Sequence, residues 1–453
     1  MSIAGDCART FATQVALLGA QMLTGMMATR MLGAEGYGTL AFVVTTATLA
    51  ATMAQLGIVY SLMQQRSQPA WTLRGAARTL SMAALSLGVV AMAITAVLVA
   101  VPLPGRVLPP IAAGLLVPGA ILAACLLVSQ LFEVFLRLCS AISTSNLARL
   151  VPRLLLVGVL GVWAAPWLWG RPVLEWPKAL AEVGMSPGAY LWLNVGVLGL
   201  GAAWMLAAAW SFGRGEPTAQ TPPPMLRALV CGGLVAWPLY LLLFLLNRLD
   251  VFVVASLFGS EPLGWYAVAS ALAELASYAG FAINAAVLSL AAGHNEHQAM
   301  DAVQRSLRFN LLLGGLSAVL LAAVAPWAVA IYAGRAYQPS TLPMLLLLPG
   351  VVAQFAFGIC SAVVARRGWF GQATLLLALA LALQAALASM LAPHHGLAGV
   401  AAARSASWLL VLGAHAVWFH RMALIPLSAW WRFDATDARL LQRRLLLWRQ
   451  AAA

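Results

Sequence analysis

Charge is the scarcest property of this sequence. Only 9% of its 453 residues are charged, whereas 62% are hydrophobic and the mean hydropathy is +0.90. This is far more apolar side chain than one globular core can hide from water. Lipid is therefore the expected solvent, and we predict a protein with many membrane-spanning helices.

Paired cysteines and long polar segments are also lacking. The five cysteines show no paired spacing and lie mainly in apolar runs, so they are expected to act as small hydrophobic residues. No outward connection exceeds about 20 residues, which leaves no room for an extramembrane domain. The histidines of the connections are expected to be solvated, and neither a metal nor a cofactor is predicted.

What remains is a series of apolar runs. About twelve are long enough to cross a bilayer as helices of about 20 residues. They lie near residues 10–31, 38–61, 79–101, 111–133, 152–170, 189–212, 228–257, 264–291, 307–332, 342–365, 372–392 and 398–420.

The basic residues indicate the orientation of these spans. The net charge of +13 comes almost entirely from arginine, since Lys178 is the only lysine. With a cytoplasmic N-terminus, the inside segments hold 19 of the 26 basic residues and the outside turns hold 5, while Arg248 and Arg404 fall within spans. This bias predicts a multi-pass membrane protein with both termini in the cytoplasm. It also explains the basicity without a nucleic-acid partner.

The chain divides into two similar halves. A polar, proline-rich stretch, "GRGEPTAQTPPPM", separates two sets of six spans. Two outside turns, "MLGAEGYGTLAF" and "LFGSEPLGWYAV", occupy matching places in the halves and lie 226 positions apart (259 minus 33). We therefore predict parallel repeats: an N-terminal bundle (1–212), a cytoplasmic linker (213–226), a C-terminal bundle (227–420) and a basic amphipathic tail (421–453) that lies on anionic lipid as an interfacial helix.

The matched turn residues have physical uses. Gly33 and Gly259 can end a helix in a left-handed conformation. Glu35 and Glu261 precede the next helix, where a carboxylate meets the positive end of the helix dipole, so they are expected to be caps and not ligands. The glycines five positions after each turn glycine leave space where the returning helix passes close to the first.

Three stretches carry a resemblance to a known family. "ATRMLGAEGYGTLAF", "NRLDVFVVASLFGSEPLGWYAVA" and "YAGRAYQPS" are similar to the first turn, the seventh span and the turn before the tenth span of bacterial polysaccharide (O-antigen-type) flippases. These belong to the multidrug/oligosaccharidyl-lipid/polysaccharide exporter superfamily. The resemblance covers most of the chain, although many relatives have two further C-terminal spans.

The resemblance implies a fold and an activity. It implies two bundles around a central cavity, and export of undecaprenyl pyrophosphate-linked oligosaccharide by alternating access for surface polysaccharide assembly. The implied partners are that lipid-linked substrate, membrane lipids and the machinery of glycan polymerisation and export.

Charges inside the spans are the candidate site residues. The repeat places Asn247, Arg248 and Asp250 near mid-depth and matches Gln21 to Asn247. Glu274 lies about ten residues into the eighth span. A charge at this depth costs a few kcal/mol, so it must face protein, water or a partner.

Two interpretations of Arg248 stay open. It can pair with Asp250 or Glu274 as a structural contact, or it can face the cavity and hold a pyrophosphate through its fixed donors while the carboxylates position it or take up a cation. Residues 248 and 250 are separated by roughly 200° on a helix, which counts against a simple pair. Arg30, at the outer end of the first span, is either a ligand that receives the phosphate late in transport or an anchor at the membrane interface. Arg404 is expected to extend to the interface.

Two other functions remain as alternatives. A cation-coupled multidrug or organic-cation exporter of the same superfamily would use carboxylates such as Asp250 and Glu274. A membrane glycosyltransferase or polymerase would act on the same lipid-linked sugars, but such enzymes need a substantial outer loop that this chain lacks. We expect a transporter and not an enzyme.

Overall fold

The structure is a computed structural model that describes residues 3–65, 72–100, 113–168, 180, 184–213, 226–277, 296–422, 424–430 and 432. Within these residues the regular secondary structure is entirely helical, as predicted. The basic tail beyond residue 432 lies outside the described residues, so the interfacial helix stays a prediction.

The helices follow the predicted order. The N-terminal half contains α1 (Ile3–Ala54), α2 (Ile58–Gln65), α3 (Leu73–Ala100), α4 (Ala113–Leu138), α5 (Ile142–Leu168) and α7 (Pro187–Gly213). The C-terminal half contains α8 (Leu226–Gly233), α9 (Trp237–Phe258), α10 (Ser260–Ala273), α12 (Glu296–Ala323), α13 (Ala325–Tyr332), η2 (Arg335–Ser340), α14 (Thr341–Arg367), α15 (Phe370–Arg421) and η3 (Leu427–Trp430).

These helices make twelve spans. Nine helices of the described residues are long and apolar enough to cross a bilayer. Two of them, α1 and α15, each consist of two spans joined at a sharp bend, at Gly33 and Gly396. The short α10 begins one more span. The prediction of about twelve spans, made from the length of apolar runs, is therefore confirmed.

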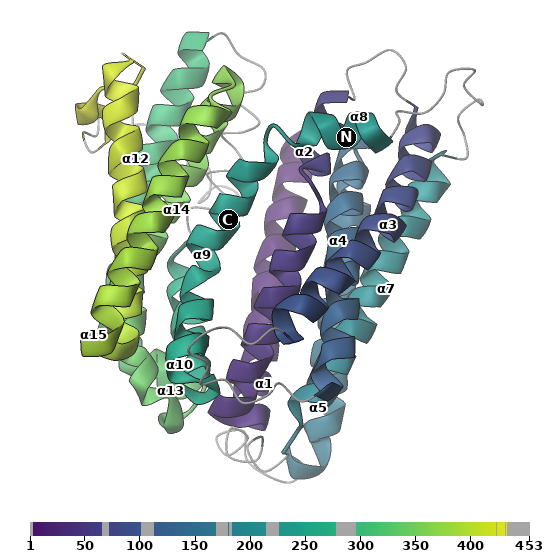
Figure 1. Ribbon diagram of the computed structural model, residues 1–453, viewed down its shortest axis with the longest axis vertical. Coiled ribbons are helices and arrows are strands. Elements are labelled where there is room, and N and C mark those ends of the chain that lie inside the picture. Colours follow the sequence, from purple (N-terminus) through teal and green to yellow (C-terminus); the bar gives the residue numbers. More distant parts are fainter. Residues whose placement is uncertain are drawn as a thin grey trace, which may run out of the picture.

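The spans form two bundles that face each other (Figure 1). One hydrophobic cluster joins α1, α3, α4, α5 and α7. Two further clusters lie mainly in the C-terminal half, and one of them also includes Phe42 of α1. The bundles meet at the end that carries the Gly33 and Gly259 turns, here called the turn end, where α1 contacts α10. Toward the other end, at which α1 begins, they diverge (Figure 1).

The seventh span is divided between the bundles. The backbone leaves helical geometry at Leu234–Ala236, and Pro238 stands in the first turn of α9, where its missing N–H is not needed. Before this break, α8 packs on α2, and Leu229 belongs to the hydrophobic cluster of the N-terminal bundle. After it, α9 packs against α15. The segment from 226 to 258 therefore connects the bundles at the end opposite the turns.

The two matched turns do have a positive φ at their glycines. The angles are φ 69° and ψ −179° at Gly33, and φ 87° and ψ −169° at Gly259. The expected left-handed helical conformation has a ψ near +47°, so the prediction was right about φ and wrong about ψ. The observed region is essentially restricted to glycine. Glu261 was predicted to precede α10 as its cap, and this was wrong: the N-cap is Gly259, without a side-chain hydrogen bond, and Glu261 lies inside the first turn. Its carboxylate is still near the positive end of the helix dipole.

The second pair of turn glycines joins the two halves. A Cβ on Gly38 would lie 1.8 Å from the carbonyl oxygen of Ser260, and a Cβ on Gly264 would lie 2.0 Å from that of Ala34. Ala34 corresponds to Ser260 and Gly38 to Gly264 in the repeat, so the contact is reciprocal, as across a two-fold axis. The close approach was predicted within each half. It occurs between the halves, because the two turns pack on each other.

We predict that Gly38→Ala and Gly264→Ala each destabilise the protein by about 1–3 kcal/mol, the usual cost of overpacking. The matched control is Gly413→Ala, because position 413 lies in α15 with open space around its Cβ position. The control should be neutral or stabilising, since alanine is the better helix former. Thermal unfolding of the purified protein measures both effects, and equal behaviour of all three variants would show that the turns are not in contact.

Candidate functional site

A cavity lies between the bundles in two adjoining parts of about 610 and 350 Å³. The larger part extends toward the end opposite the turns, where Glu133 and Arg149 line it, and the smaller part extends toward Tyr37 and Tyr332 at the turn end. Six residues line both parts, which makes them continuous: Gln21, Thr48, Arg153, Phe244, Arg248 and Glu274.

The repeat is visible in the cavity wall. Gln21 and Asn247 correspond to each other in the two halves, and both line the cavity. Thr48 and Glu274 also correspond, and both line it. The two halves therefore present equivalent faces to the cavity, but only the C-terminal half carries charge at these positions.

Arg248 faces the cavity and is paired at the same time. Its side chain keeps 35% exposure although it lies in the middle of α9. Arg248 Nη1 lies 3.1 Å from Oε1 of Glu274, whose side chain is 28% exposed. The two interpretations left open by the sequence are therefore compatible, with Glu274 and not Asp250 as the partner.

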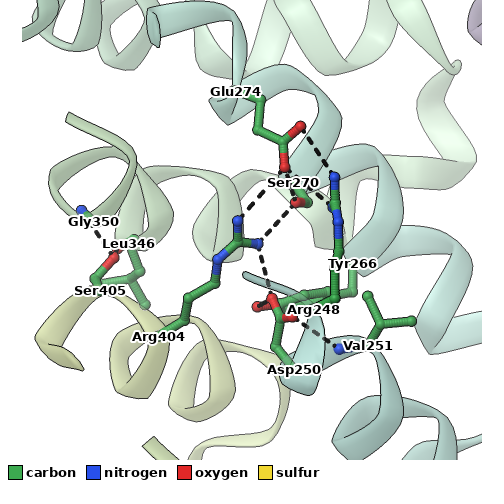
Figure 2. A network of polar contacts seen from close by, with 10 residues as sticks. All are labelled: Arg248, Asp250, Val251, Tyr266, Ser270, Glu274, Leu346, Gly350, Arg404 and Ser405. Atoms are coloured by element: carbon green, nitrogen blue, oxygen red, sulfur yellow. Dashed lines mark hydrogen bonds and ion pairs between the residues drawn. The ribbon is translucent and has the colours of Figure 1, made fainter. Parts of the chain in front are cut away.

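Asp250 points away from the cavity into the C-terminal bundle. Its side chain is fully buried and lies 2.9 Å from Nη1 of Arg404, which is 2% exposed (Figure 2). Tyr266 donates a hydrogen bond of 2.6 Å to the same carboxylate oxygen, and the Val251 amide donates one of 3.0 Å to the other. The prediction that Arg404 extends to the membrane interface was wrong, because a buried carboxylate holds it inside the bundle.

Arg153 is a cavity residue that the sequence interpretation missed. It was counted among the cytoplasmic arginines because it lies near the start of the fifth span. In the structure it lies in the fourth turn of α5 and lines both parts of the cavity, as Arg248 does from the opposite bundle. Among the described residues no carboxylate pairs with Arg153. Arg153 falls within the apolar run predicted as the fifth span, 152–170, and this position could have identified it as a charge inside the membrane.

A further group of charges lies at the wide end of the cavity. Glu133 of α4 pairs with Arg137 on its own helix and, at 2.9 Å, with Arg149 of α5. Glu133 and Arg149 line the larger part of the cavity. Among the described residues that line the cavity, there are three arginines (Arg149, Arg153 and Arg248) and two glutamates (Glu133 and Glu274), which leaves an excess of positive charge.

The turn end is closed by contacts between α1 and the segment that contains "YAGRAYQPS". Arg30 lines neither part of the cavity; it donates hydrogen bonds to the carbonyl oxygens of Ala330 and Ile331 at the end of α13. Tyr337 of η2 donates a buried hydrogen bond of 2.9 Å to the carbonyl oxygen of Thr29. The guanidinium predicted as a late phosphate ligand thus serves as a contact between the bundles in this structure.

Comparison with known proteins shows which solved structures share this fold. No protein-family model and no curated protein matches the chain. Solved structures do match. A MOP superfamily transporter from Pyrococcus furiosus, for which the reverse polarity of its binding pocket suggests a different function, aligns with a TM-score of 0.64 and 13% identity over 92% of this chain and 95% of its own.

Two further solved structures match over the same share of this chain. An outward-facing multidrug resistance MATE family transporter of the MOP superfamily aligns with a TM-score of 0.63 and 13% identity, over 92% of this chain and 95% of its own. The lipid II flippase MurJ in an inward closed conformation aligns with a TM-score of 0.62 and 12% identity, over 92% of this chain and 89% of its own. The chain is thus a multi-pass membrane protein with the twelve-helix repeat fold of these transporters.

We predict that breaking the buried pair is costly. Asp250→Asn or Arg404→Gln alone should lower the stability by about 3–5 kcal/mol, because each leaves the other charge buried without a partner. The double variant should recover much of this loss. As a control, Glu133→Gln removes a partly exposed carboxylate and should cost about 1 kcal/mol or less. Thermal denaturation of the purified variants tests this, and equal loss for Asp250→Asn and Glu133→Gln would contradict it.

Proposed function

We propose that this protein flips undecaprenyl pyrophosphate-linked oligosaccharide across the bacterial inner membrane by alternating access. The observation that carries the proposal is the pair Arg153 and Arg248, which line one cavity from opposite bundles. The similarity in fold to the lipid II flippase MurJ supports it, since a lipid-linked substrate fits this architecture. The resemblance to polysaccharide flippases suggests the glycan class and, as partners, the machinery of glycan polymerisation and export.

A diphosphate is the chemical group that suits two arginines. A guanidinium presents several N–H donors in a fixed plane and binds phosphate oxygens in pairs. Arg153 has no carboxylate partner among the described residues, and Arg248 has one that is partly exposed. A diphosphate dianion between them would supply one negative charge for each of the two guanidinium groups. The lipid tail of the substrate would pass between the bundles into the membrane.

Neutral polar groups beside the arginines suit sugars. Asn247 and Gln354 line the larger part of the cavity. The carbonyl oxygen of each side chain is buried and accepts no hydrogen bond from the described residues. A sugar hydroxyl is a donor of suitable size for such an oxygen, and binding would remove the cost of leaving it unpaired. A volume of about 610 Å³ lies within the range of about 300–1,000 Å³ typical of small-molecule pockets.

The arginine distribution orients the transport cycle. If the arginine-rich connections are cytoplasmic, the cavity opens toward the cytoplasm and the closed turn end faces outward. The substrate then enters between α4, α5 and α9 and leaves once the turn end has opened. Opening requires the loss of the contacts that Arg30, Gly38 and Tyr337 make between the bundles.

A multidrug or organic-cation exporter is the second candidate, because several of the matched structures are MATE proteins and two of them are described as multidrug resistance transporters. That function needs a carboxylate free to bind a cation. Glu274 lines the cavity but is paired with Arg248, and Asp250 is buried. Export of a lipophilic cationic dye from vesicles, driven by an ion gradient, would favour this candidate over the flippase.

We predict that Arg248→Ala and Arg153→Ala each slow flipping at least about tenfold, because each removes charge-assisted hydrogen bonds worth about 1.5–3 kcal/mol. The assay follows a labelled lipid-linked glycan in reconstituted vesicles. Arg366→Ala is the matched control, since Arg366 is exposed at the end of α14 and lines neither part of the cavity. Parental rates in both cavity variants would exclude the proposed phosphate site.

We also predict that Arg30→Ala combined with Tyr337→Phe opens the turn end. The double variant removes the hydrogen bonds that hold α1 to α13 and η2. A cysteine in place of Thr24, which lines the part of the cavity near the turn end, reports the opening. A membrane-impermeant thiol reagent applied from outside should label it several-fold faster in the double variant. A native-cysteine-free background is the reference, and unchanged labelling would show that these contacts do not close the cavity.

A further inference from the structure

Glu274 lies between two arginines of different environment. On its cavity side, Oε1 lies 3.1 Å from Nη1 of the partly exposed Arg248. On its other side, the same oxygen lies 3.5 Å from Nη2 of the buried Arg404 (Figure 2). The carboxylate is thus shared between a guanidinium that the substrate can reach and one that it cannot.

Arg404 is fixed by one half of its guanidinium only. Nη1 lies 2.9 Å from Asp250 and donates a hydrogen bond of 3.0 Å to Ser270. Nη2 is buried and makes no hydrogen bond with the described residues, in spite of its 3.5 Å distance to Glu274. A buried charged donor without a hydrogen bond is costly, so Nη2 has an unused capacity for a carboxylate.

Ser270 connects the two arrangements. Its hydroxyl oxygen accepts from Arg404 Nη1 and donates a hydrogen bond of 3.2 Å to Oε1 of Glu274. Glu274 therefore keeps two contacts on the Arg404 side when it leaves Arg248. A shift of less than 1 Å would convert the 3.5 Å ion pair into a hydrogen bond of ordinary length, about 2.8 Å.

We propose that Glu274 is a displaceable counter-ion: an anionic substrate takes Arg248, and the glutamate moves onto Nη2 of Arg404. This rests on the proposed function, because it requires a diphosphate at Arg248. Arg404 is then a positioning residue, which never touches the substrate but receives the carboxylate that the substrate displaces. In the reverse direction, the return of Glu274 to Arg248 helps to release the anion.

The balance of charge explains why a second arginine beside Glu274 is useful. With Glu274 on Arg248, the C-terminal side of the cavity is neutral and its arginine is held in place without a substrate. An anion that had to expel Glu274 into an apolar bundle would bind weakly, because an unpaired buried carboxylate is costly. The second arginine removes that cost. The exchange keeps every charge of the group paired in both states.

The test measures binding of a soluble short-chain prenyl diphosphate to the purified full chain in lipid nanodiscs by calorimetry. Glu274→Gln removes the competing carboxylate, so the Kd should fall about tenfold, the order of one close charge pair. In the flipping assay the same variant should have a lower KM and a lower kcat, since release is slowed.

Arg404→Lys tests the receiving side. It keeps a positive charge beside Asp250 but replaces the two terminal nitrogen atoms, Nη1 and Nη2, by a single Nζ. No second nitrogen is then left for Glu274, which stays on Arg248. The Kd should rise about fivefold in the parental background and should not change in the Glu274→Gln background, which is a coupling that a double-mutant cycle measures directly. Ser270→Ala, which removes the connecting hydroxyl, should show the same pattern more weakly and serves if Arg404→Lys does not fold.

The outcomes separate this inference from the proposed function. If the parent does not bind the diphosphate, or if Arg248→Ala binds it as tightly as the parent, the proposed phosphate site is wrong and the inference is wrong with it. If binding depends on Arg248 but Glu274→Gln does not tighten it, only the inference is overturned. The same holds if Arg404→Lys and Ser270→Ala weaken binding equally in both backgrounds, because a purely structural role predicts additive effects.

Discussion

The constraint behind the whole structure is the cost of placing ionised groups among apolar helices. Each such group loses several kcal/mol of hydration unless it gains an opposite charge and hydrogen bonds. Asp250 meets this requirement completely: its carboxylate forms an ion pair with Arg404 and accepts hydrogen bonds from the Tyr266 hydroxyl and the Val251 amide. Since Asp250 lies on α9 and Arg404 on α15, the pair also fixes the seventh span against the twelfth. Arg248, two residues before Asp250, is thereby directed toward the cavity.

The repeat determines where the bundles can move. At the turn end they touch through backbone, because Gly38 and Gly264 carry no side chain and the contact is reciprocal. At the other end the connection is the broken seventh span, with α8 on the N-terminal bundle and α9 on the C-terminal bundle. Rigid bundles joined at a non-helical break and held at the far end by a few polar contacts have the parts needed for hinge motion.

Much of this could be predicted from the sequence, and the exceptions have physical reasons. Apolar runs and the matched turns are local signals, and they predicted the twelve spans and the repeat. The repeat also matched Gln21 to Asn247, and both line the cavity. Arg153 was missed because its helix begins eleven residues before it, at Ile142, so that a residue counted as cytoplasmic lies within the bundle. The partner of Arg404 lies 154 positions away, and no local pattern reveals such a contact.

The distribution of charge between the halves bears on mechanism. Positions that match through the repeat, Thr48 with Glu274, are neutral in one half and charged in the other, so duplication alone did not create the cavity's chemistry. The N-terminal bundle supplies its cation from a different span, at Arg153. An anion bound to both arginines would therefore connect two bodies that separate when the cavity opens on the other side. In the proposed cycle such a ligand would have to be released from at least one arginine, and the proposed return of Glu274 to Arg248, the arginine that it adjoins, would make that release directional.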